Sequence, residues 1–211
     1  MPGSSTDKDF AEAKRAHQAG DRARAEIYYR KVLAQAPKEP QALYLLGALC
    51  VDAKRFEEAK EHLTKSLAAR PAYMPAHAML GTVCANLNLS DGSIKHFRIV
   101  VDAAPQDVGA QLNLARTLAH FGQASEAIPI FQRAYAKKSD DVAVVLGLAE
   151  ALDEVGEKDQ AIAVLQSFAA RTVAHGQAFV ALGRLLQRYG RTEEAVAAFE
   201  RCLRHHPQQA D

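Results

Sequence analysis

A 34-residue period runs through the whole sequence and constrains its fold more than any other feature. The segment that starts at Ala42 returns at Ala76, and leucine followed by alanine or glycine keeps the same step at Leu114, Leu148 and Leu182. Six units fit end to end without insertion or deletion, at residues 6–39, 40–73, 74–107, 108–141, 142–175 and 176–209. An unbroken period of this length is typical of a repeat protein, in which each unit packs against its neighbours.

The repeat places small and large residues in fixed columns, numbered here from the first residue of each unit. Position 8 is always small and holds Ala13, Gly47, Gly81, Ala115, Ala149 and Gly183. Position 20 is also small and holds Ala25, Ala59, Ser93, Ala127, Ala161 and Ala195. Position 24 holds the large residues Tyr29, Leu63, Phe97, Phe131, Leu165 and Phe199. Because small residues let helices approach closely, each unit is predicted to be a pair of packed antiparallel helices.

Turn residues separate the two helices of a unit and end the second one. Position 15 holds Gly20, Asn88, Gly122, Gly156 and Gly190, with Lys54 as the exception. Glycine and asparagine tolerate the left-handed conformation that ends a helix. Position 32 holds Pro37, Pro71, Pro105 and Pro207, which end the second helix. Pro129 falls near the start of a second helix, where its missing N–H costs little. About twelve helices are expected and strand signals are absent.

These columns resemble the tetratricopeptide repeat (TPR) family over residues 6–209, although the tryptophan that the family has at position 4 is missing throughout. The resemblance implies an all-α, right-handed α-solenoid of six TPR helix-turn-helix units. It also implies a concave face, lined by the first helices, that binds peptides or partner helices. We predict one TPR domain over residues 6–209, a disordered N-terminus at 1–5 and a tail at 210–211.

Positions 2, 5, 9 and 12 centre about 130° away from the packing stripe of each first helix, given about 100° per residue. They form a second stripe that is unusually apolar for a surface, with charges at one end, and this favours docking of an amphipathic helix or a hydrophobic peptide. We add Asn113, at position 6, as a possible hydrogen-bond donor to a bound backbone. The predicted groove stripe is Tyr44, Ala48, Val51, Ala78, Thr82, Ala85, Leu112, Asn113, Arg116, Ala119, Glu150, Asp153, Val180, Arg184 and Gln187. The alternative is that neighbouring first helices bury part of this stripe.

Composition narrows the class of partner and the compartment. The net charge of +1 gives no electrostatic reason to expect a nucleic acid. No apolar stretch is long enough for membrane insertion, and no secretory signal is visible. Cys50, Cys84 and Cys202 fall at packing positions and make no disulfide framework, so a cytoplasmic location is expected.

No catalytic, cofactor or metal motif is found, so we expect neither an enzyme nor a bound cofactor. The sequence has no phosphate-binding glycine loop, no Cys-x-x-Cys and no His-Glu-x-x-His. His62 and His96 share position 23, and we expect them to stack in register as partly exposed surface residues. The acidic group from Glu150 to Glu157, which includes Asp153, has no acid–base partner and is expected to be solvated or to face a partner.

The two ends of the array differ. Asp9 and Glu12 occupy core columns of the first unit, which is therefore expected to be a solvated end. The last second helix carries Val196, Phe199 and Leu203, part of which should pack against something further. This predicts a homodimer through that end, a partner that covers it, or a chain cut from a longer protein.

We therefore expect a non-catalytic scaffold that binds a protein or peptide partner in the concave groove. The alternative is an N-terminal arm that recruits the substrate or a partner for a larger glycosyl- or sulfotransferase. A third possibility is an assembly factor at the cell envelope, which would need an upstream signal or a lipid-attachment cysteine.

Overall fold

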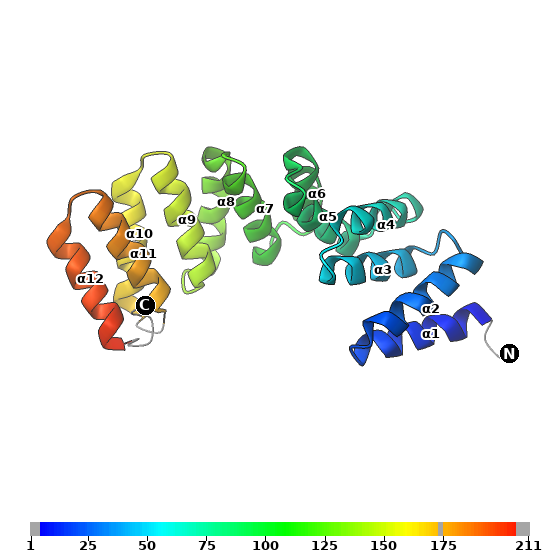
Figure 1. The fold of residues 1–211 in the computed structure, drawn as a ribbon. Coiled ribbons are helices and arrows are strands. Elements are labelled where there is room, and N and C mark those ends of the chain that lie inside the picture. The colour runs from blue at the N-terminus through cyan, green and yellow to red at the C-terminus, as the bar shows by residue number, and fades with distance from the viewer. Residues whose placement is uncertain (1–4, 173–174, 206–211) are drawn as a thin grey trace. The chain divides into compact units, whose positions relative to one another are not determined.

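The computed structural model describes residues 5–172 and 175–205, and these residues form twelve α-helices without a strand among them (Figure 1). The helices are α1 (Ser5–Gln18), α2 (Arg22–Gln35), α3 (Pro40–Asp52), α4 (Phe56–Ala69), α5 (Met74–Asn86), α6 (Ser90–Ala103), α7 (Val108–His120), α8 (Ala124–Lys137), α9 (Val142–Glu154), α10 (Lys158–Arg171), α11 (Gly176–Arg188) and α12 (Thr192–His205). The α1 helix starts one residue before the first predicted unit, and the rest of the predicted N-terminus and the 210–211 tail lie outside the described residues.

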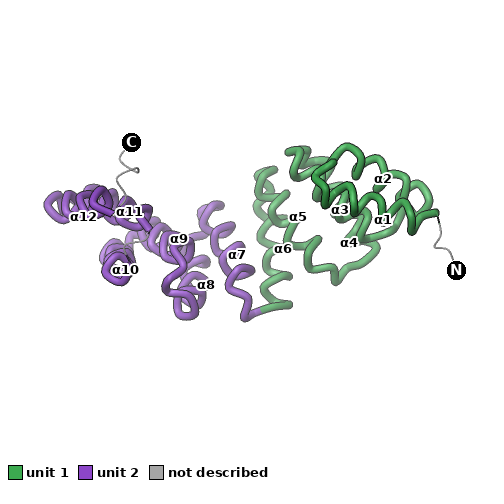
Figure 2. The backbone as a smooth tube through the Cα atoms, turned by 90° about the horizontal axis from the view of Figure 1, so that it is seen from below, with its two compact units in different colours: residues 1–104 green, residues 105–211 purple. Residues whose placement is uncertain are grey.

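Each predicted repeat is one hairpin of two consecutive helices. The chain forms two compact units, residues 1–104 with α1–α6 and residues 105–211 with α7–α12, coloured separately in Figure 2. Inside each unit the second helix of one hairpin packs against the first helix of the next. The predicted all-α solenoid of helix-turn-helix repeats is confirmed. That the six repeats form one domain stays a prediction, and each unit is described by itself below.

In every hairpin the residue at position 15, in the turn between the two helices, has a left-handed backbone conformation. Gly20, Gly122, Gly156 and Gly190 have φ between 72° and 85°. Lys54 and Asn88 also adopt this conformation, each with φ of 57°. At Lys54 the turn is closed by two backbone hydrogen bonds, from Lys54 N–H to Val51 C=O (2.9 Å) and from Arg55 N–H to Cys50 C=O (2.8 Å). This is the Schellman arrangement, and it forms here although a lysine occupies the strained position.

Position 8 and position 24 face one another across a hairpin, as the small and large columns predict. The Phe97 ring lies over Gly81, so close that an added Cβ at Gly81 would come within 2.9 Å of the ring. Phe199 lies over Gly183 in the same way, at 2.5 Å from the position of an added Cβ. The missing side chain is therefore what allows a phenylalanine to enter these two hairpins.

Two polar side chains occupy the buried position 4. Each forms a hydrogen bond with the carbonyl group of the proline at position 32 of the preceding repeat. His77 Nε2 lies 2.9 Å from the Pro71 carbonyl oxygen, and Gln111 Nε2 lies 2.6 Å from the Pro105 carbonyl oxygen. These bonds satisfy carbonyl groups that follow the end of a helix.

His96 pairs with His77 and not with His62, so the expected stacking of His62 on His96 is wrong. The two Nδ1 atoms of His77 and His96 lie 2.9 Å apart. Since His77 Nε2–H donates to a carbonyl, its Nδ1 accepts and His96 Nδ1–H donates. Burial, with His77 and Lys95 nearby, lowers the pKa of His96 to about 4.

The expectation for Pro129 is also corrected. The α8 helix starts at Ala124, which makes Pro129 its sixth residue and places it beyond the first turn. The N–H that it lacks would have bonded within the helix, so this proline removes one internal hydrogen bond of α8.

Replacing Lys54 with glycine should stabilise the protein. Glycine removes the Cβ strain of the left-handed conformation, and we expect the free energy of unfolding to rise by about 0.5–1 kcal/mol in urea denaturation. The reciprocal variant Gly156→Lys should lower it. A loss of stability in Lys54→Gly would contradict this account of the turn.

Acid should destabilise the α5–α6 hairpin through His96. Its pKa is low in the folded protein and ordinary in the unfolded chain, so the unfolded chain binds the extra proton and stability falls as pH drops from about 6.5 towards 4. Because the ring is only half-buried, we expect a loss on the order of 1–2 kcal/mol. The measurement is the unfolding free energy at pH 7 and pH 5 for the wild type, His96→Gln and the exposed control His120→Gln. An equal acid loss in His96→Gln would contradict the assignment.

Candidate functional site

The first helices of the second unit line a cleft. Helix α9 contacts α7 on one side and α11 on the other, and a hollow of about 510 Å³ lies along them. Its lining residues are Arg116, Ala119, His120, Phe131, Val142, Ala143, Leu146, Gly147, Glu150, Ala151, Glu154 and Gln177. We call this hollow the α9 cleft. Its lining combines apolar side chains with a few charged ones.

The floor of the α9 cleft depends on one glycine. The position-24 residue of repeat 4, Phe131, lies against Gly147 of the next repeat. An added Cβ at Gly147 would lie 2.5 Å from the Phe131 ring. Gly147 thus leaves room for the ring at the bottom of the cleft.

Opposite charges stand on the two walls of the α9 cleft. Arg116 and His120 come from α7, whereas Glu150 and Glu154 come from α9, and all four side chains are exposed. The described residues offer no ion-pair partner to Arg116, Glu150 or Glu154. These charges are therefore available to a bound molecule.

A smaller hollow of about 210 Å³ lies between α9 and α11, and Glu150, Asp153, Arg184 and Arg188 are among its lining residues. Asp153 is only 14% exposed, and it accepts hydrogen bonds from the Arg188 guanidinium and the Tyr189 hydroxyl. The hydrogen bond to Asp153 also raises the pKa of Tyr189 above its ordinary value. Asp153 is therefore paired within the chain, which corrects for this residue the expectation that the acidic group is solvated or faces a partner.

The groove stripe of the second unit lies on the surface, and part of it forms the two hollows. Arg116, Ala119 and Glu150 line the α9 cleft, while Asp153 and Arg184 line the smaller hollow. The remaining stripe residues of this unit are half-buried or exposed but line neither hollow: Leu112, Asn113, Val180 and Gln187. None of the stripe residues in this unit is fully buried.

Sequence reasoning missed several cleft residues. Ala143 and Leu146 stand at positions 2 and 5 of repeat 5, the same columns that define the stripe in other repeats, so the column rule could have found them. Gly147 and Phe131 could not have been found in this way, because their contact joins two repeats outside the stripe columns.

The stripe of the first unit lies on α3 and α5. It consists of Tyr44, Ala48, Val51, Ala78, Thr82 and Ala85, all half-buried except for the exposed Thr82. The Tyr44 ring packs edge-on against Tyr73 at 5.1 Å between centroids. The Thr82 hydroxyl donates to the Ala78 carbonyl of its own helix. This half of the stripe is consequently an apolar surface with few polar groups that are free to direct a ligand.

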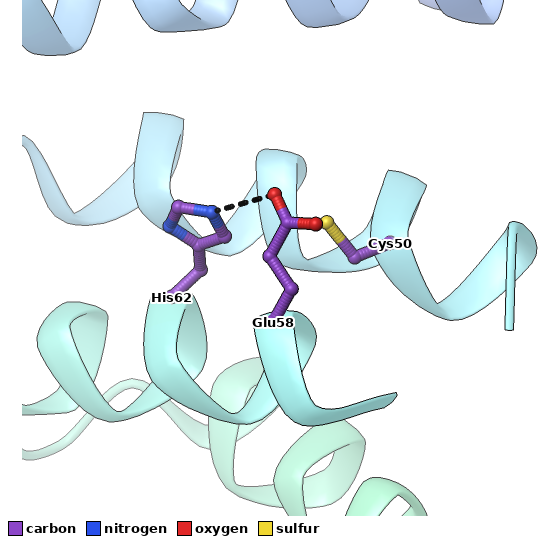
Figure 3. Close-up of side chains that lie close together, drawn as sticks. All are labelled: Cys50, Glu58 and His62. Atoms are coloured by element: carbon purple, nitrogen blue, oxygen red, sulfur yellow. Dashed lines mark ion pairs between the residues drawn. The ribbon is translucent and has the colours of Figure 1, made fainter. Parts of the chain in front are cut away.

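Three possible metal ligands meet at the α3–α4 hairpin (Figure 3). Cys50 comes from the end of α3, and Glu58 and His62 stand one turn apart on α4. One donor atom from each lies within 4.8 Å of the other two. We call this group the Cys50–Glu58–His62 cluster. Cys84 and Cys202 are buried and free, as expected for packing residues.

The outer face of α12 carries exposed apolar side chains. Val196 is 50% exposed and Leu203 is 46% exposed. Phe199 is half-buried, because its ring is used in packing over Gly183. Self-association through these residues stays a prediction.

Comparison with known proteins identifies the family. Three family models, each described as tetratricopeptide repeat, match residues 16–87 with 118–185, 79–142 and 178–211. The chain belongs to the tetratricopeptide repeat family. No curated protein sequence matches it. In the described residues, no TPR helix has the length and apolar character needed to span a membrane.

Solved TPR structures share its fold. A tetratricopeptide repeat protein from Parabacteroides merdae matches with a TM-score of 0.83 and 14% identity, over 96% of this chain and 80% of its own. PilW, described as a widely conserved type IV pilus biogenesis factor, matches at 0.75 and 18%, over 98% and 96%. YrrB, described as a TPR protein with an unusual peptide-binding site, matches at 0.67 and 17%, over 85% and 93%. Identities this low establish the TPR fold and nothing finer.

Replacing Gly147 with alanine should destabilise the protein, because the new methyl group meets the Phe131 ring. We expect a loss of about 1 kcal/mol or more, as overpacking outweighs the better helix propensity of alanine. The loss should be smaller in a Phe131→Leu background, since other repeats combine leucine at position 24 with a side chain at position 6. Urea denaturation of the two single variants and the double variant measures this coupling. Additive losses would show that the two residues do not interact.

Proposed function

We propose that this TPR protein is a non-catalytic scaffold that binds a peptide segment of a partner protein in the α9 cleft. The observation that carries the proposal is the cleft itself, a hollow along three first helices whose charged side chains have no partner among the described residues. Surfaces of this kind, apolar with a few fixed polar groups, suit peptides and amphipathic helices. The peptide-binding site of YrrB, a protein of the same fold, is consistent with this proposal.

The charges of the cleft define the segment that would fit. Arg116 favours an acidic side chain beside α7, and Glu150 with Glu154 favours a basic one beside α9. Apolar side chains between them would cover Ala119, Ala143 and Leu146. We therefore expect a ligand that carries both charge signs around an apolar centre, and charge complementarity would set its direction in the cleft.

The lining holds a few polar groups of the kinds that recognise charges and amides. They are one arginine, one histidine, two glutamates and one glutamine.

Peptides selected against the purified protein from a random library should lose affinity when the cleft is altered. We expect Ala119→Glu and Arg116→Glu each to weaken binding about tenfold or more, equivalent to about 1.4 kcal/mol, in fluorescence anisotropy titrations. Both side chains are half-buried or exposed, so neither change enters the core.

Matched controls come from exposed positions of the second helices. Ala163→Glu on α10 and Arg133→Glu on α8 introduce the same charges away from the cleft lining and should leave affinity unchanged. Unchanged affinity in both cleft variants, or equal losses in cleft and control variants, would overturn the proposal.

A further inference from the structure

We propose that the Cys50–Glu58–His62 cluster binds one Zn²⁺ ion. The site is separate from the α9 cleft and lies within the first unit. It revises the expectation from sequence that the chain holds no metal ligands.

The geometry of the cluster is close to what zinc requires. Zinc binds sulfur at about 2.3 Å and nitrogen or oxygen at about 2.0–2.1 Å, so tetrahedral ligands lie roughly 3.3–3.6 Å apart. One Glu58 carboxylate oxygen lies 3.6 Å from His62 Nε2, and the Cys50 sulfur lies within 4.8 Å of one donor atom of each of these residues. A small movement of the Glu58 and His62 side chains, which are 34% and 17% exposed, brings the three ligands to one ion. Three protein ligands leave a fourth position for water.

The two arginines that form hydrogen bonds with Glu58 also pair with a second carboxylate. The Glu58 carboxylate accepts hydrogen bonds from Arg55 at 2.9 Å and Arg30 at 3.1 Å. Arg30 and Arg55 also pair with Glu26, at 2.6 and 2.8 Å. When Glu58 turns to a metal ion, both guanidinium groups keep Glu26, so metal binding leaves neither cation unpaired.

The protonation of the ligands is compatible with a metal. Burial lowers the pKa of His62, so its ring is neutral at pH 7 and free to coordinate. Burial, assisted by Glu58, raises the pKa of the Cys50 thiol to about 11. The ion must therefore displace the thiol proton to solvent as the sulfur–zinc bond forms. Because the buried His62 Nδ1 has no hydrogen-bond partner in the described part of the chain, we expect weaker binding than at a four-ligand structural site.

The next repeat supplies an internal comparison. Positions 11, 19 and 23, which hold Cys50, Glu58 and His62 in repeat 2, hold Cys84, Gly92 and His96 in repeat 3. The carboxylate is replaced by glycine there, and His96 is bonded to His77. Repeat 3 thus keeps a buried cysteine and a histidine at the same positions but lacks the carboxylate, which makes Cys84 a matched control.

Cobalt titration of the reduced, metal-stripped full chain tests the proposal. We expect one Co²⁺ to bind with a thiolate-to-cobalt charge-transfer band and the intense visible bands of a tetrahedral site, and Zn²⁺ to remove both. Cys50→Ser should abolish the charge-transfer band. His62→Gln should weaken Co²⁺ binding about tenfold or more. Cys84→Ser should change neither the band nor the affinity.

Three results of the cobalt titration would overturn the proposal. No charge-transfer band with excess Co²⁺, a band that survives Cys50→Ser, or a band lost in Cys84→Ser would each exclude the site. Far-UV circular dichroism checks that the variants remain folded. If Cys50→Ser unfolds, His62→Gln decides, since its side chain reaches the surface, and unchanged affinity in that variant counts against the site.

Discussion

The packing of one large side chain against one small residue is the interaction that holds the two helices of a hairpin together. Leu63, Phe97 and Phe199 lie against the glycine at position 8 of their own hairpin. The other position-24 residues Tyr29 and Leu165 are almost completely buried as well. Each such burial contributes about 2–3 kcal/mol, but a single hairpin leaves its other apolar faces exposed. Stacking covers them, because the second helix of one repeat packs on the first helix of the next. The groove stripe of the first helices is only partly covered by this packing, since Tyr44 and Val51 are half-buried against the core. Its exposed part is the surface that remains for a partner.

The period was sufficient to predict the helices and the turns, because both depend on residues at fixed spacing. The turn at Lys54 has the same backbone conformation as the other turns, although its residue at position 15 is not glycine. Its neighbours Arg55 and Cys50 close the same hydrogen bond as in the other turns, and the packed helices on both sides hold the lysine in a conformation that it disfavours on its own. Tertiary packing here outweighs a local preference of about 1 kcal/mol.

The candidate site was predicted only in part, and the missing part has a common cause. The repeat columns predict which positions face one another. They do not predict which of two neighbouring residues a given side chain contacts. Phe131 packs against Gly147, which belongs to the next repeat. His96 likewise took His77 as its partner. Asp153 was engaged by an arginine and a tyrosine of the following repeat. Each choice depends on the rotamers and the polar groups that surround a position, which a period cannot express.

One part of the Cys50–Glu58–His62 cluster also occurs in another repeat, and the rest is particular to repeat 2. Arginine at position 16 and glutamate at position 19 also pair in repeat 6, where Arg191 contacts Glu194 at 2.6 Å at the start of α12. That repeat has Leu186 and Ala198 at positions 11 and 23, so the glutamate has an ion-pair role that needs no metal. What distinguishes repeat 2 is a thiol and an imidazole added on either side of an existing carboxylate. Position 11 lies on the first helix of a hairpin, and positions 19 and 23 lie on the second. An ion bound there would therefore hold α3 to α4 and leave the groove stripe of α3 free.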